Sequence, residues 1–131
     1  MNQPREYENK FLELLTEYPK YIVTKLGYLD SGDIKDEFIR DLWVRVTNGI
    51  GKDTSDYDAS NVVSQAMIDT GIVEKGHYYT SQLSDVTPES VVAKIMEMAF
   101  LRRIAYLNQE LLQAYTNSDI ELEAYESAKR I

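Results

Sequence analysis

The sequence predicts a single, mainly α-helical domain over residues 1–131, with five to six helices and one small β-hairpin. The hydrophobic fraction of 44% and the charged fraction of 27% are typical of a globular chain and not of a disordered one. Apolar residues recur at helical spacing along most of the chain, and the longest such run extends from Thr87 to Tyr115. We therefore expect the fold to be organised around one long helix from 88 to 115.

Helical spacing also predicts the first two helices. The apolar positions of the first are Tyr7, Phe11, Leu14, Leu15 and Tyr18. Its glutamates, which we expect to point outward, are Glu6, Glu8, Glu13 and Glu17. Pro4 suits the first turn, and Pro19 breaks the helix and begins a second one that ends at Gly27.

Two further helices follow a turn at residues 30–33. One is expected from 33 to 47, with carboxylates in its first turn and a buried stripe of Phe38, Ile39, Leu42, Trp43 and Val46. Residues 48–58 have the composition of a loop. We expect the next helix to be capped by Asp58 or Ser60 and stopped by Gly71. Its inward residues are then Val62, Val63, Ala66 and Met67.

After Gly71 the pattern changes to one that strands prefer. Ile72 and Val73, a turn at 74–76, and residues 77–80 predict a short two-stranded hairpin. Thr87 and Pro88 then start the long helix. Beyond Tyr115, the spacing of Ser118 and Glu121 is that of a capping box. The apolar line of the terminal helix it predicts is Ile120, Ala124, Ala128 and Ile131.

The long helix carries an apolar seam at alternating steps of four and three residues, formed by Phe100, Ile104, Leu107, Leu111 and Ala114. A helix of this length reaches roughly 40 Å, which is longer than a small core needs. We therefore expect it to bury apolar surface either against a second copy, as a homodimer, or against another protein. The expected interface residues are Phe100, Ile104, Leu107, Leu111 and Tyr115.

The stretch Val63…Met67…Thr70-Gly71-Ile72-Val73-Glu74…Tyr78-Tyr79-Thr80 resembles winged helix-turn-helix regulators of the PadR type. The resemblance implies a winged-helix core over 33–80, with 87–131 serving packing or dimerisation. It also implies a transcriptional regulator that binds duplex DNA as a dimer. The residues that would then contact the nucleic acid are Ser60, Asn61, Ser64 and Gln65 on the recognition helix, and Lys75 and His77 on the wing.

The charge distribution opposes DNA as the partner. The net charge is −8, and residues 51–85 hold two lysines against six acidic residues. The expected recognition helix, 58–70, has neither Lys nor Arg, the residues that usually contact phosphates and guanines. The alternative function is therefore an acidic protein-interaction adaptor, assembly subunit or inhibitor that does not bind DNA, such as a phage-type structural or accessory protein.

No motif indicates an enzyme. The stretch Gly49–Lys52 lacks the spacing of a phosphate-binding loop, and the aspartates of 53–58 lack that of a calcium loop. His77 is the only histidine, and there is no cysteine. We expect no catalytic residue, no cofactor and no metal. The sequence shows neither a secretion signal nor an apolar run of membrane-spanning length, so we expect a cytoplasmic protein that does not bind a membrane.

Overall fold

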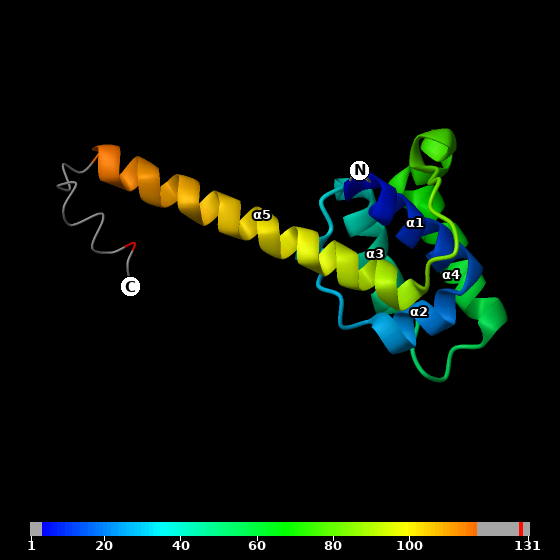
Figure 1. The fold of residues 1–131 in the computed structure, drawn as a ribbon. Helices are drawn as coiled ribbons and strands as arrows, with labels where there is room; N and C mark the ends of the chain where they lie inside the picture. The colour runs from blue at the N-terminus through cyan, green and yellow to red at the C-terminus, as the bar shows by residue number, and fades with distance from the viewer. Residues whose placement is uncertain (1–3, 118–128, 130–131) are drawn as a thin grey trace. The chain divides into compact units, whose positions relative to one another are not determined.

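The computed structural model describes residues 4–117 and residue 129 (Figure 1). Its α-helices are α1 (Pro4–Glu17), α2 (Pro19–Leu26), α3 (Glu37–Gly49), α4 (Asp56–Thr70) and α5 (Pro88–Asn117). Two 3₁₀ segments, η1 (Ser31–Asp33) and η2 (Ile72–Tyr79), complete the described elements. The prediction of a mainly α fold is confirmed. The chain divides into two compact units, Met1–Ala99 and Phe100–Ile131.

Helix boundaries in the first unit follow from particular capping residues. Pro19 separates α1 from α2 as expected. Helix α3 begins at Glu37 and not at 33, because the Asp36 carboxylate accepts hydrogen bonds from the backbone N–H groups of Phe38 and Ile39. The predicted cap of α4, Asp58 or Ser60, is wrong: Ser55 caps the helix, and its hydroxyl accepts a hydrogen bond from the backbone N–H of Asp58. The helix ends at Gly71 as predicted. Gly71 has φ +84°, a left-handed conformation that glycine adopts without strain.

The core of this unit is formed by α1 to α4 with the first three turns of α5. Its largest fully buried side chain is Trp43, whose indole N–H donates to the Leu29 carbonyl at 2.9 Å. The Phe11 ring meets the Trp43 ring edge-on, with centroids 5.1 Å apart. Four of the five residues in the expected α3 stripe are buried, and Phe38 is half-buried. Tyr18, which the sequence predicts among the apolar positions of the first helix, lies between α1 and α2 and is exposed.

The predicted hairpin is wrong. In the described backbone, residues 72–79 form two short 3₁₀ turns joined at Lys75, and no strand is present. Ile72 and Tyr79 are buried against the helices, and the Tyr79 hydroxyl donates to the Asp36 carboxylate at 3.1 Å. A lone two-stranded hairpin is marginally stable, whereas these turns bury both residues on a formed helical core. The wing of a winged-helix fold is therefore not seen.

The outward position predicted for Glu8 is also wrong. Glu8 is 4% exposed, and its carboxylate accepts hydrogen bonds from the backbone N–H groups of Lys35 at 2.7 Å and Asp36 at 2.8 Å. Burial of this charge is possible because both oxygens are hydrogen-bonded. Glu8 thus fixes the segment that leads into α3 against α1.

Helix α5 matches its predicted start and ends two residues beyond the predicted 115. The predicted terminal helix after Tyr115 lies outside the described residues. None of the helices in the described part of the chain combines the length and apolarity needed to cross a membrane.

Candidate functional site

Burial along α5 changes at residue 100. Up to that point its apolar side chains belong to the core, and Val91, Val92, Ile95 and Ala99 are at most 2% exposed. Beyond it the large apolar side chains are between 40% and 64% exposed, namely Phe100, Leu101, Ile104, Tyr106, Leu107, Leu111 and Leu112. The second half of this helix therefore displays an unusual number of apolar side chains that the described residues do not cover.

Four of these exposed residues form a stripe along the second half of the helix. We call Phe100, Ile104, Leu107 and Leu111 the α5 seam. With 3.6 residues per turn, steps of four and three residues keep these four side chains on one side of the helix. The seam is therefore an exposed apolar stripe along the second half of α5.

Four of the five residues predicted for an oligomer interface form the seam, and all four are exposed. The fifth, Tyr115, is half-buried. The seam is flanked on one side by Arg103 and Glu110, both exposed. The exposure of these four side chains leaves the predicted interface a prediction.

Four of the six residues predicted to contact nucleic acid share α4, which contains neither lysine nor arginine. Ser60, Asn61, Ser64 and Gln65 are all exposed on α4, and the Gln65 amide donates to Asp69 at 2.9 Å. Helix α4 begins with Asp56 and Asp58. The Lys75 ammonium lies over the Phe38 ring, 4.1 Å from its centroid. The side chain of His77 is not among those described.

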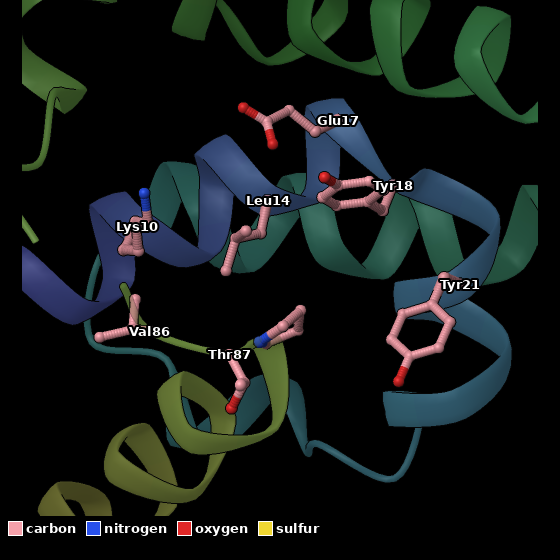
Figure 2. Close-up of a pocket in the computed structure, with 8 residues that line it drawn as sticks. Lys10, Leu14, Glu17, Tyr18, Tyr21, Val86 and Thr87 are labelled. Carbon is pink, nitrogen blue, oxygen red and sulfur yellow. The ribbon is translucent and has the colours of Figure 1, made fainter. Parts of the chain in front are cut away.

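A second surface feature is a cleft of about 600 Å³ in the first unit. Figure 2 shows the residues that line it, which come from α1, α2 and the start of α5: Lys10, Leu14, Glu17, Tyr18, Tyr21, Val86, Thr87 and Pro88. Leu14, Val86 and Pro88 supply an apolar wall. Tyr18 and Tyr21, 53% and 44% exposed, supply two accessible rings.

The polar groups of the cleft differ in whether they have a hydrogen-bond or ion-pair partner. The Lys10 ammonium lies 3.9 Å from the Glu13 carboxylate. The Tyr21 hydroxyl donates a hydrogen bond to Glu89, which lowers the pKa of the Glu89 carboxyl and raises that of Tyr21. In the described residues, by contrast, the exposed Glu17 carboxylate has neither a hydrogen bond nor an ion pair.

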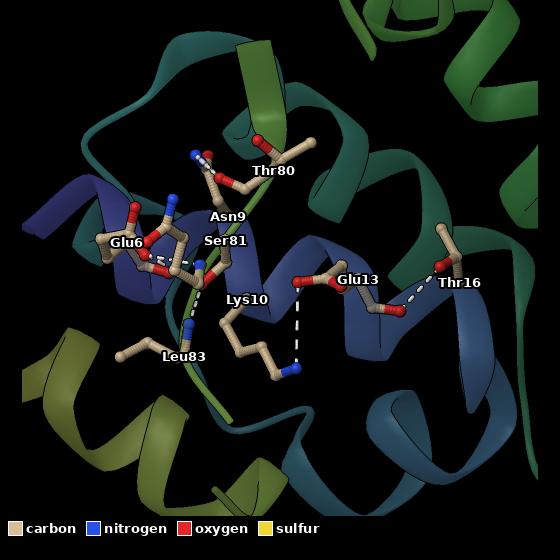
Figure 3. Close-up of polar contacts among 9 residues, drawn as sticks. Glu6, Asn9, Lys10, Glu13, Thr16, Thr80, Ser81 and Leu83 are labelled. Carbon is tan, nitrogen blue, oxygen red and sulfur yellow. Dashed lines mark hydrogen bonds and ion pairs between the residues drawn. The ribbon is translucent and has the colours of Figure 1, made fainter. Parts of the chain in front are cut away.

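Residues 80–82, which lead to the cleft, are hydrogen-bonded to α1. Figure 3 shows the Asn9 amide donating to the Thr80 carbonyl at 3.0 Å and the Ser81 hydroxyl donating to the Glu6 carbonyl at 3.1 Å. The Glu6 carboxylate also accepts from the backbone N–H of Gln82 at 2.9 Å. These contacts fix the backbone just before Val86, so one wall of the cleft is positioned by the fold.

The sequence pattern does not predict this cleft. It places Tyr18 among the apolar positions of the first helix and Glu17 on the outward side, and it assigns no position to Tyr21. The available signal was the high count of ten tyrosines, two of which flank Pro19. A break at proline presents the two rings from different helices, and periodicity within one helix does not describe that arrangement.

In the part of the chain that the structure describes, no cluster of acidic, histidine or cysteine side chains has the geometry to hold a metal ion. Comparisons of the chain with protein-family models, with curated proteins and with solved structures found no match.

Proposed function

We propose that this chain is a non-catalytic, cytoplasmic assembly subunit that acts through protein–protein contact along α5. The observation that supports the proposal is the α5 seam, whose four apolar side chains are 40–64% exposed. With the neighbouring Leu101 and Leu112, the exposed apolar surface is on the order of 500 Å². Apolar patches of this size on a protein surface mark interaction sites.

The partner we propose is a second copy of the chain. A stable interface buries roughly 800 Å² on each partner. The seam together with Leu101 and Leu112 supplies over half of that area, and the polar side chains that flank it supply the rest. The steps of four and three residues are those of a coiled-coil helix, in which each apolar side chain inserts between residues of the facing helix.

Charge complementarity favours an antiparallel pair. In that orientation Ile104 faces Leu107 of the second copy, and Phe100 faces its Leu111. The same register sets Arg103 opposite Glu110 of the second copy, twice by symmetry. A parallel pair sets Arg103 opposite Asn108 and so makes no ion pair.

The first test is the oligomeric state of the full chain, measured by sedimentation equilibrium over a range of protein concentrations. We expect a dimer that Ile104→Asp converts to a monomer, because the substitution places a charge in the apolar interface. Ile68→Asp is the matched control, since Ile68 is 61% exposed on α4 and lies outside the seam. It should leave the dimer intact. A wild-type chain that stays monomeric at all concentrations, or equal effects of both substitutions, would refute the proposal.

The second test concerns the orientation. Arg103→Glu and Glu110→Arg should each weaken the dimer about five-fold, and the double variant should restore it. Within one helix the two residues are seven positions, or about 10 Å, apart, so they do not pair with each other in the same chain. A double variant no tighter than either single variant would exclude the antiparallel register.

Duplex DNA is the alternative partner, and one observation favours it: Ser60, Asn61, Ser64 and Gln65 are exposed along α4. Fluorescence anisotropy of a labelled random duplex distinguishes the two functions. We expect no binding at low salt, because the acidic α4 region repels phosphates. Binding that falls steeply with added salt would establish a basic surface and favour the regulator.

A further inference from the structure

The cleft beside α1 has a chemical character that the proposed assembly through α5 does not use. It lies wholly within residues 10–88, and its volume of about 600 Å³ is in the range of ligand-binding sites. One wall is aliphatic, and the opposite part presents the rings of Tyr18 and Tyr21 (Figure 2). Such a surface accepts an apolar group and the face of a planar or cationic group at the same time.

The charges around the cleft select a cation. Its only lysine, Lys10, already lies beside the Glu13 carboxylate, and Glu89 is engaged by the Tyr21 hydroxyl. Glu17 is left as a carboxylate with no partner among the described residues. Among the described residues that line the cleft, Glu17 is the only acidic one, so an anionic occupant would be repelled by its carboxylate, whereas a cationic one would gain a direct partner in it.

The geometry is also fixed before anything binds. The hydrogen bond between Tyr21 and Glu89 joins α2 to the first turn of α5 and restrains the Tyr21 ring. Pro19 and Pro88, one on each side, limit the backbone conformations of the two walls. A wall that is already ordered reduces the entropy lost on binding.

We propose that this cleft is a docking site for a partner protein and receives an arginine side chain with a neighbouring aliphatic residue. The guanidinium stacks on the tyrosine rings and pairs with the Glu17 carboxylate, and the aliphatic side chain contacts Leu14 and Val86. Arginine is preferred over lysine because its planar, weakly hydrated group both stacks on aromatic rings and binds a carboxylate through two N–H groups. The site is separate from the α5 seam, so either proposal stands without the other.

The test uses the full chain, labelled with ¹⁵N, and two blocked peptides: acetyl-leucyl-arginine amide and acetyl-leucyl-glutamine amide. Amide chemical shifts are followed during titration. We expect saturable shifts at residues 14–21 and 86–89, and about five-fold tighter binding of the arginine peptide. Equal affinities for the two peptides, or shifts located elsewhere, would overturn the proposal.

Two variants test the role of the carboxylate. Glu17→Gln should weaken binding of the arginine peptide about three-fold and leave that of the glutamine peptide unchanged. Glu37→Gln is the matched control, because Glu37 is also an exposed glutamate but lies on α3, away from the cleft. Both variants keep their fold, as the dispersion of their amide spectra will verify. Unchanged arginine-peptide binding by Glu17→Gln, or equal losses in the two variants, would remove the basis for a cation site.

Discussion

Glu8 is the most informative single residue for the stability of the first unit. Its carboxylate is buried and accepts two backbone N–H groups, those of Lys35 and Asp36, at 2.7 and 2.8 Å. Hydrogen bonds to a charged group contribute about 1.5–3 kcal/mol each, and a buried donor without an acceptor costs a similar amount. Glu8→Gln keeps the shape of the side chain but replaces one acceptor with an NH₂ group. We therefore expect it to lower the free energy of unfolding by about 2–3 kcal/mol.

The assay is urea unfolding at one fixed protein concentration, followed by the fluorescence of the buried Trp43. Glu17→Gln is the control, because it makes the same substitution at an exposed position of the same helix. It should change the free energy of unfolding by less than about 0.5 kcal/mol. If Glu8→Gln unfolds like the control, the two hydrogen bonds do not hold the entry to α3, and the packing of α1 described above is wrong.

Three other predictions concern the glycine that ends α4, the pKa of the Glu89 carboxyl and the second half of α5. Gly71→Ala should cost about 1 kcal/mol because of the left-handed φ alone, since no atom lies within 4 Å of the added Cβ, whereas Gly51→Ala should cost nothing; urea unfolding measures both. Tyr21→Phe should raise the pKa of the Glu89 carboxyl toward its ordinary value, because it removes the hydrogen bond that lowers it. That hydrogen bond contributes to stability above the pKa of Glu89 in the unfolded state, and the contribution is lost as the pH falls through the pKa of Glu89 in the folded state. An NMR titration of Glu89 measures the folded-state pKa. A chain shortened to end at Arg103 should keep the tryptophan fluorescence and unfolding transition of the first unit but lose dimerisation in sedimentation equilibrium, because the core residues all precede residue 100.

Helix α3 shows what local sequence rules predict well. Its apolar residues repeat at helical spacing, and the partner surface is the core itself, so the pattern and the observed burial agree at Ile39, Leu42, Trp43 and Val46. Its first residue was predicted less well. Several carboxylates precede the helix, and only the tertiary fold decides that Asp36 caps it while Asp33 is buried in η1.

Glu8 and the 72–79 segment show why other features were not predicted. A glutamate at a helical position is usually solvated, and its burial depends on two N–H groups that lie 27 and 28 residues further along the chain. The β-branched and aromatic residues of 72–79 prefer strands, yet their conformation is set by where Ile72 and Tyr79 find burial. In both cases a contact distant in sequence outweighs a local preference.

The seam of α5 shows most clearly the difference between what sequence periodicity predicts and what it does not. Val92, Ile95 and Ala99 repeat at the same helical steps as Ile104, Leu107 and Leu111, yet the first three are buried and the last three are exposed. Periodicity reports that a face is apolar and does not report which surface covers it.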